Sequence, residues 1–93
     1  MNEETVEKVV EKLVNELQGQ LAEKKVHIQL SKAARKWLAQ KGYEPAFGAR
    51  PLRRFIMKEI GDVLTEEILF GALSKGGTAI VDHKKGAMVF TYK

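Results

Sequence analysis

The chain has 93 residues, of which 44% are hydrophobic and 30% charged, and its formal net charge is +4. This length is that of one domain, residues 1–93, with a small core, and the composition is typical of a globular protein rather than a disordered one. The sequence contains no cysteine, which excludes a disulfide framework, a thiolate nucleophile and a cysteine-based zinc site.

The first residues of the chain and the length of its apolar runs indicate the cellular compartment. Residues 1–7 are polar and acidic, whereas an export signal begins basic and continues apolar. No apolar run approaches the roughly 20 residues that cross a bilayer. We therefore expect a cytoplasmic protein without a membrane partner, and the lack of cysteine is compatible with a reducing compartment.

The charges are unevenly distributed. Residues 1–24 hold three lysines and six glutamates, whereas residues 32–58 hold eight basic residues and one acidic residue, Glu44. An electropositive segment of this kind suits an anionic partner, which could be a nucleic acid, a nucleotide phosphate or an acidic protein face.

The first half of the chain predicts a helix, a strand and a second helix. Apolar residues recur every three or four positions from Glu3 to Glu23, which predicts an amphipathic helix. Residues 26–30 alternate between apolar and polar and predict a short strand with one buried face. Ser31 is expected to cap a second helix of about three turns, and Gly42 to end it in the left-handed conformation.

The second half predicts a loop, a long helical stripe and a hairpin. Residues 43–50 form the expected loop, and Pro51 is the expected first residue of the next helix. The apolar stripe of this predicted helix runs to Gly71 and includes Leu69. Gly61, inside the stripe, is expected to mark a break into two helices. Strands at residues 78–81 and 87–92 are joined by a turn at residues 82–86. The fold class is α+β, with the order helix, strand, helix, helix, strand, strand and a sheet of about three strands.

Conventional catalytic and metal-binding patterns are missing from the sequence. His27 and His83 lack HExxH spacing and have no cysteine to share a metal, so we expect no metal site. Ser31 is better explained as a cap than as a nucleophile. No GxxxxGK[ST] loop is present, so the chain by itself is not expected to hold a triphosphate or its magnesium.

The segment with the most distinctive chemistry is residues 42–52, GYEPAFGARPL. Its glycines, prolines and aromatic residues deliver Arg50 to the start of a helix, and Pro51 is expected to hold Arg50 outside the α region. A guanidinium beside free backbone N–H groups at a helix N-terminus suits an anion such as phosphate. A tight turn with Arg50 in a solvated or internal salt bridge is the simpler alternative from the residues alone.

The same segment resembles the GYDPxFGARPL motif in the C-terminal small domain, or lid, of Clp-type AAA+ protein unfoldases. The resemblance covers nearly the whole chain. Residues 30–41 are similar to the preceding stretch of that family, and residues 67–77, with ILFGALSKGG, are similar to the end of its ClpA branch in particular. The resemblance implies a helical AAA+ C-terminal lid domain, from the second AAA+ module of a ClpA-like protein.

The resemblance also implies roles for individual residues. Arg50 corresponds to the sensor-2 arginine, which reaches the terminal phosphate of ATP bound by the large domain, and Gly48, Ala49 and Pro51 belong to the same nucleotide-binding motif. Arg53 and Arg54 either face solvent or contact a neighbouring subunit. No residue of this chain is expected to be catalytic by itself.

The implied partners belong to the full-length protein. They are ATP with magnesium, not held tightly by this chain, the AAA+ large domains of the same and neighbouring subunits in a hexamer, protein substrates and a ClpP-type peptidase. A basic nucleic-acid-binding domain is an alternative, although no RNP motif, KH-type loop or zinc finger is present. A stand-alone oligomerisation module is a third possibility.

Overall fold

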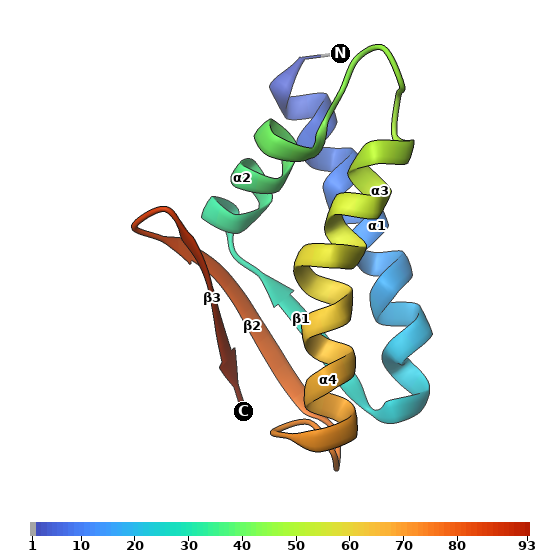
Figure 1. The fold of residues 1–93 in the computed structure, drawn as a ribbon, viewed down its shortest axis with the longest axis vertical. Helices are drawn as coiled ribbons and strands as arrows, with labels where there is room; N and C mark the ends of the chain where they lie inside the picture. The colour runs from blue at the N-terminus through green and yellow to red at the C-terminus, as the bar shows by residue number, and fades with distance from the viewer. Residues whose placement is uncertain (1) are drawn as a thin grey trace.

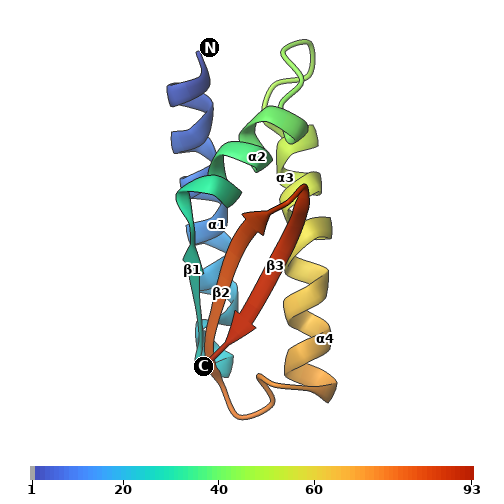
Figure 2. The same cartoon turned by 90° about the vertical axis from the view of Figure 1, so that its left-hand side faces the viewer.

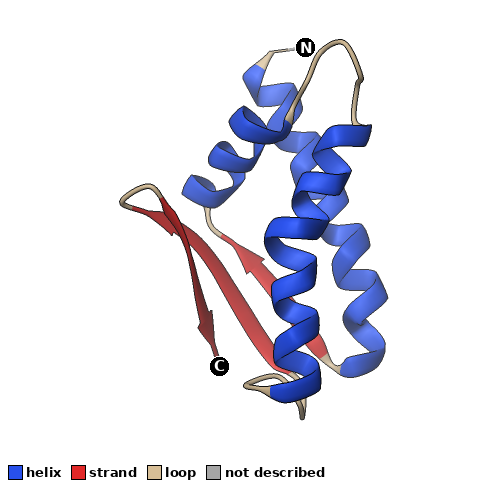
Figure 3. Cartoon of the chain, in the orientation of Figure 1, coloured by secondary structure: helices blue, strands red, loops and turns tan. Residues whose placement is uncertain are grey.

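The computed structural model describes residues 2–93, in which the helices pack on one side of a three-stranded sheet (Figure 1, Figure 3). The predicted α+β class and element order are confirmed. In chain order the elements are α1 (Glu3–Leu21), the short 3-10 helix η1 (Ala22–Lys24), β1 (Val26–Leu30), α2 (Lys32–Gly42), α3 (Arg50–Ile56), the π-helical η2 (Met57–Gly61), α4 (Asp62–Phe70), β2 (Gly77–Lys84) and β3 (Ala87–Tyr92).

Helix α1 forms where the sequence predicts an amphipathic helix. Its first turn is capped by Asn2, whose side-chain oxygen accepts a hydrogen bond from the Thr5 N–H at 2.8 Å. The buried stripe faces the core and consists of Val6, Val10, Leu13, Val14 and Leu17. After η1 the chain turns into β1 through Lys25, which has a left-handed φ of 62°.

The sheet has the order β1-β2-β3, with β1 parallel to β2 and β2 antiparallel to β3 (Figure 2). The predicted hairpin is present, but its turn is shorter than residues 82–86. Only Lys85 and Gly86 lie between the strands, and both have a positive φ, 52° and 79°. A two-residue turn of this handedness matches the twist of the strands, so the ladder extends through Lys84.

The core lies between the sheet and the helices as one cluster. The buried side chains include Val10 from α1, Leu38 from α2, Leu52 from α3 and Val81 from β2. In the apolar stripe of the second half, Leu52, Ile56, Ile60 and Leu64 are buried, and Phe55, Val63 and Ile68 are partly buried. Leu69 is 63% exposed and so does not belong to the core. Among residues 2–93, no helix combines the length and the apolar character needed to cross a membrane.

Helices α3 and α4 form one rod, joined by the π-helical segment η2 (Figure 1). The predicted break at Gly61 is therefore not an interruption of the helix. The backbone there forms a π-helical turn, which holds one more residue than an α-helical turn, and the chain stays helical. The Asp62 N–H bonds to the Met57 carbonyl, and the Thr65 hydroxyl donates to the Gly61 carbonyl at 2.8 Å. A Cβ at residue 61 would clash with the Met57 sulfur, so glycine makes room for that side chain.

Ser31 links α2 to the sheet. Its Oγ accepts from the Ala34 N–H at 3.0 Å, which confirms the predicted cap, and donates to Asp82 Oδ1 at 2.6 Å. The Ser31 hydrogen bond is the main reason that the pKa of Asp82 lies below its ordinary value, and the His83 backbone N–H adds to the effect. The start of α2 is thereby fixed to β2.

Replacing Ser31 with alanine should lower the free energy of unfolding at neutral pH by about 1 kcal/mol, because a helix cap is lost. Asp82 has a depressed pKa in the fold, so its ionised form stabilises the fold above the unfolded-state pKa of about 4, and this stabilisation disappears as the pH falls through the folded-state pKa. Ser31→Ala should therefore lose less stability on acidification than the parent chain does. Urea unfolding at several pH values measures both effects.

Ser74→Ala is the matched control, since Ser74 is exposed, and its free energy of unfolding should change by no more than about 0.5 kcal/mol. An unchanged acid dependence in Ser31→Ala would show that Ser31 does not stabilise the Asp82 carboxylate.

Candidate functional site

An open pocket of about 450 Å³ lies between the loop at residues 43–49 and the first turns of the α3–η2 rod. Its lining combines three cations, one carboxylate and an apolar wall. The lining residues are Glu44, Phe47, Arg50, Pro51, Arg54, Phe55 and Lys58.

The loop forms the outer wall of the pocket. The Glu44 carbonyl accepts hydrogen bonds from the N–H groups of Phe47, at 3.0 Å, and Gly48, at 3.1 Å. Gly48 has a φ of 69°, a conformation that side chains other than glycine rarely adopt. No atom of the chain lies within 4 Å of the place where a Cβ at residue 48 would sit. Glycine is therefore needed here for its positive φ and not to avoid a steric clash. The turn leaves the Phe47 ring 70% exposed at the pocket.

Arg50 stands inside the first turn of α3. The prediction that Pro51 is the first helical residue, with Arg50 held outside the α region, is wrong by one residue. Ala49 already has helical angles, φ −88° and ψ −9°, and its carbonyl accepts from the Arg53 N–H at 2.9 Å. This bond draws Arg50 into the helix despite the following proline. No side chain caps this end of α3.

Three cations share one face of the rod. Arg50, Arg54 and Lys58 are four residues apart, so each lies about one turn after the last. All three are exposed, and none takes part in an ion pair within residues 2–93. The pocket therefore presents a row of three cations without an ion pair beside the aromatic side chains of Phe47 and Phe55, with Glu44 as the one carboxylate of the lining. We call Arg50, Arg54 and Lys58 the cationic row.

Other basic residues of the same segment are paired with α1. Arg53 does not line the pocket and contacts Glu16 of α1 at 3.2 Å, and Arg35 contacts both Glu7 and Glu11. The acidic N-terminal helix thus neutralises part of the basic middle segment. Part of the uneven charge of the sequence is therefore an internal pairing of helices. Of the basic residues in 32–58 without an ion pair among the described residues, Arg50, Arg54 and Lys58 line the pocket, and Lys32, Lys36 and Lys41 are exposed elsewhere.

Aromatic packing holds the pocket wall in place. The Trp37 ring lies 5.4 Å from Phe55 and stacks on His83 at 4.9 Å, measured between ring centroids. His83 belongs to β2 rather than to the predicted turn, and its Nε2 is buried without a hydrogen-bond partner. Phe55 is thereby connected through α2 to the sheet.

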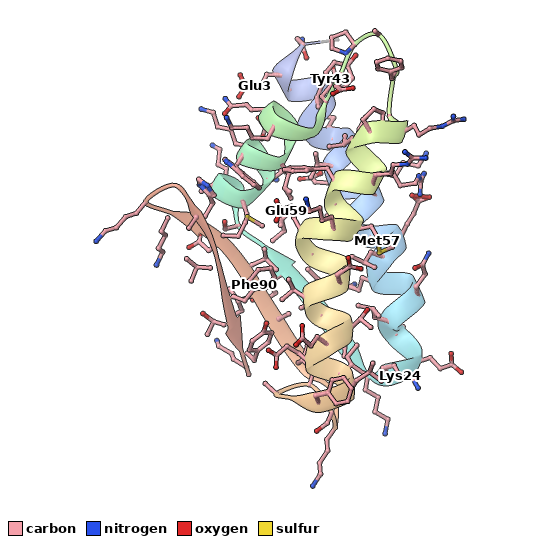
Figure 4. All side chains as sticks on the ribbon, in the orientation of Figure 1. Glu3, Lys24, Tyr43, Met57, Glu59 and Phe90 are labelled. Atoms are coloured by element: carbon pink, nitrogen blue, oxygen red, sulfur yellow. The ribbon has the colours of Figure 1, made fainter. Side chains whose placement is uncertain are left out.

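Figure 4 shows Tyr43, where the loop leaves α2, beside Glu3 near the start of α1.

Gly42 allows α2 and α3 to pack closely. It is the last residue of α2 and is buried, and it does not adopt the predicted left-handed conformation. A Cβ at residue 42 would lie 2.8 Å from Leu52 Cδ1 and 2.8 Å from Phe55 Cδ2. The glycine is required for this close contact rather than for a turn.

The described residues contain no cluster of three or more metal-binding side chains. His27 is exposed on β1, and His83 is stacked on Trp37. The pocket itself offers one carboxylate, Glu44.

Comparison with known proteins decides the family. The model for the C-terminal, D2-small domain, of ClpB protein matches residues 1–81. The chain belongs to this family of Clp-type AAA+ small domains. A ClpA homolog protein from Fuscovulum blasticum is 46% identical to this D2-small domain over 89 residues, which are 96% of the domain and 11% of the relative. A chaperone protein ClpB from Corynebacterium efficiens is 40% identical over 86 residues, or 92% of the domain and 10% of the relative.

Both ClpA-like and ClpB-like proteins are thus relatives of this D2-small domain. A further chaperone protein ClpB, from Brucella suis, is 48% identical over 68 residues, which are 73% of the domain and 8% of the relative. The domain spans about a tenth of the length of these relatives. The resemblance drawn from residues 42–52 is confirmed at the level of the family.

Sequence reasoning about this D2-small domain missed part of the pocket. Phe55 belongs to the apolar stripe that the sequence predicts for the core, and Lys58 is one of the eight basic residues of 32–58, yet both line the pocket. The spacing of Arg50, Arg54 and Lys58 at intervals of four already places them on one helix face. The contribution of Phe47 and Glu44 depends on the shape of the loop, which no periodicity in the sequence encodes.

Substituting Gly42 with alanine should destabilise the domain by about 1 to 3 kcal/mol, because the new methyl group overlaps Leu52 and Phe55. Gly19→Ala is the matched control, since Gly19 lies in α1 with no atom near its would-be Cβ. That control should stabilise the domain by about 0.5 to 1 kcal/mol. Thermal unfolding compares the two, and an unaltered stability of Gly42→Ala would contradict close packing of α2 on α3.

Proposed function

We propose that this D2-small domain is the lid of an ATP-driven Clp machine and supplies Arg50, as the sensor-2 residue, to ATP bound by the large domain. The observation that carries the proposal is the position of Arg50, which is exposed and unpaired in a pocket with two further cations. An arginine used only for folding would be expected to have a carboxylate partner, as Arg53 and Arg35 do.

The residues of the pocket fit the phosphate end of a nucleotide. Guanidinium groups form charge-assisted, bidentate hydrogen bonds with phosphate oxygens, and two arginines, Arg50 and Arg54, line the pocket. Gly48 and Ala49 shape the turn that precedes Arg50, and Pro51 stabilises the first turn of its helix. The phosphates of ATP would supply the negative charge that these residues bind.

Magnesium and the triphosphate need further residues. The sequence lacks a phosphate loop, and within the described pocket Glu44 is the one carboxylate. We therefore assign magnesium binding and the chemical step to a large domain in the full-length protein. The lid would add Arg50 when it closes, and would link the nucleotide state to the orientation of the rod that carries Arg50.

The proposed partners follow from family membership. They are the large domains of the same and of a neighbouring subunit, in a hexamer that acts on protein substrates. Arg54 at the pocket and Arg53, whose side chain is 59% exposed despite its ion pair, are the proposed contributors to a subunit contact. A ClpP-type peptidase as a further partner is supported by the ILFGALSKGG stretch of residues 67–77, which is similar to the ClpA branch.

Arg50→Ala in the full-length protein should lower the rate of ATP hydrolysis by roughly 10- to 1,000-fold, because an arginine that contacts the transferring phosphoryl group stabilises its charge. Arg50→Lys should restore only part of the rate, because an ammonium group is a point charge without the planar pair of donors. Steady-state ATP turnover of the purified assembly measures both.

The isolated domain provides the control for folding. Arg50 is exposed, so Arg50→Ala should change the free energy of unfolding of the 93-residue chain by no more than about 0.5 kcal/mol. Normal ATP turnover of the variant would remove Arg50 from the mechanism. Reduced turnover together with an unfolded domain would mean that Arg50 is structural.

A further inference from the structure

Strand β3 forms one edge of the sheet, and its outward backbone groups have no partner among the described residues. Thr78 and Lys93 exchange two hydrogen bonds, at 3.0 and 2.9 Å, and in an antiparallel ladder every second pair does so. In the register of β2 and β3, the N–H and C=O groups that point away from β2 are therefore those of Met88, Phe90 and Tyr92. The edge thus presents three donors and three acceptors.

The opposite edge of the sheet is partly covered. The Gln18 side chain of α1 accepts a hydrogen bond from the Ile28 N–H of β1 at 2.7 Å. Within residues 2–93, no side chain forms such a bond to the backbone of β3. Residues 87–92, AMVFTY, also carry no charge, although charged side chains are a usual protection of an edge strand. The β3 edge is therefore open to a further strand.

The rod presents two carboxylates and an exposed aromatic ring on the β3 side of the domain. Figure 2 shows α4 on that side, away from β1. Glu59, Val63 and Glu67 lie about one turn apart and are half-buried, and Phe70 is 83% exposed. Burial raises the pKa of Tyr92, and the nearby charge of Glu67 adds to the effect, so this flank adjoins the end of β3. We call Glu59, Val63, Glu67 and Phe70 the acidic flank.

The acidic flank is separate from the cationic row, which lines the pocket. Neither Glu59 nor Glu67 takes part in an ion pair within the described part of the chain. Two carboxylates without a cation, beside an exposed aromatic ring, favour a partner that carries basic and apolar side chains.

We propose that an extended segment of a partner polypeptide adds to β3 as a fourth, antiparallel strand and directs basic side chains toward the acidic flank. Its backbone would bond to Met88, Phe90 and Tyr92, whose side chains pack on the core side of the sheet. Every second side chain of the added strand would then face the rod. The site is distinct from the nucleotide pocket and adds a partner to the proposed lid.

The spacing of the acidic flank sets the pattern of the partner. Glu59 and Glu67 lie about 12 Å apart along a helix, because each residue rises about 1.5 Å. Four residues of a strand span about 13 Å. A strand along the rod therefore meets both carboxylates with basic residues at positions i and i+4, and Val63 with an apolar residue at i+2.

The test titrates the 93-residue chain with a blocked seven-residue threonine peptide that has lysine at its second and sixth positions and valine at its fourth. Amide hydrogen exchange followed by NMR detects strand addition directly. Without peptide, the amides of Met88, Phe90 and Tyr92 should exchange quickly, and those of Val89 and Thr91, which bond to β2, slowly. Saturating peptide should slow the first three by about tenfold or more. A peptide with glutamate in place of both lysines should bind about 5- to 10-fold more weakly.

Met88→Pro and Met88→Ala form a matched pair for the backbone contact. Both lose the Met88 side chain, but only proline removes the outward N–H, and neither change removes a hydrogen bond to β2. Met88→Pro should therefore bind the lysine peptide about 3- to 10-fold more weakly than Met88→Ala does. Slow exchange at Val89 and Thr91 checks that β2 and β3 still pair in both variants.

Glu59→Gln and Glu66→Gln form a matched pair for the charge. Glu59→Gln should weaken binding of the lysine peptide by about 2- to 5-fold. Glu66 is exposed and lies outside the acidic flank, so Glu66→Gln should weaken it by less than about 1.5-fold.

Three outcomes would overturn the proposal. Unchanged exchange at Met88, Phe90 and Tyr92 in the presence of peptide would exclude strand addition. Equal affinity for the lysine and glutamate peptides would remove the acidic flank from the contact. Slow exchange at the same three amides without peptide, increasing with protein concentration, would assign the edge to a second copy of the chain. None of these outcomes involves nucleotide, so the role of Arg50 is tested separately.

Discussion

The close contact between Gly42 at the end of α2 and Phe55 in α3 determines where the pocket lies. Because residue 42 has no side chain, Leu52 and Phe55 approach its backbone, and the Trp37 ring packs against Phe55 from the same helix α2. Trp37 in turn stacks on His83 of β2. The pocket wall formed by Phe55 is therefore connected to the sheet by continuous packing.

A second constraint is the pairing of acidic residues of α1 with basic residues of α2 and α3. The carboxylates of α1 pair with Arg35 and Arg53, and these pairs lie where α1 meets α2 and α3. Three cations of the segment that have no ion pair among the described residues, Arg50, Arg54 and Lys58, line the pocket together with Phe47 of the loop. Such surface pairs add little stability, and their effect here is to neutralise Arg35 and Arg53 while the three cations at the pocket stay without an ion pair.

Local chemistry explains which features could be predicted from the sequence. The cap at Ser31 and the stripe of α1 depend on residues that are close together in the chain, and both are as predicted. The start of α3 at Arg50 was missed because the carbonyl of Ala49 already accepts the first helical bond, which outweighs the usual effect of proline on the preceding residue. The role of Gly42 was missed because it depends on Phe55, a residue from another helix. For the site, spacing alone could have grouped Arg50 with Lys58, whereas the shape of the loop could not be predicted.

The central claim is that the lid contributes Arg50 to a nucleotide held by another domain. The most direct measurement is a structure of the full-length assembly with a non-hydrolysable ATP analogue and magnesium. The account predicts that the Arg50 guanidinium lies within hydrogen-bonding distance, about 3 Å, of a terminal phosphate oxygen. An Arg50 side chain that points away from a fully occupied nucleotide site, or that pairs with a carboxylate in every subunit, would contradict it.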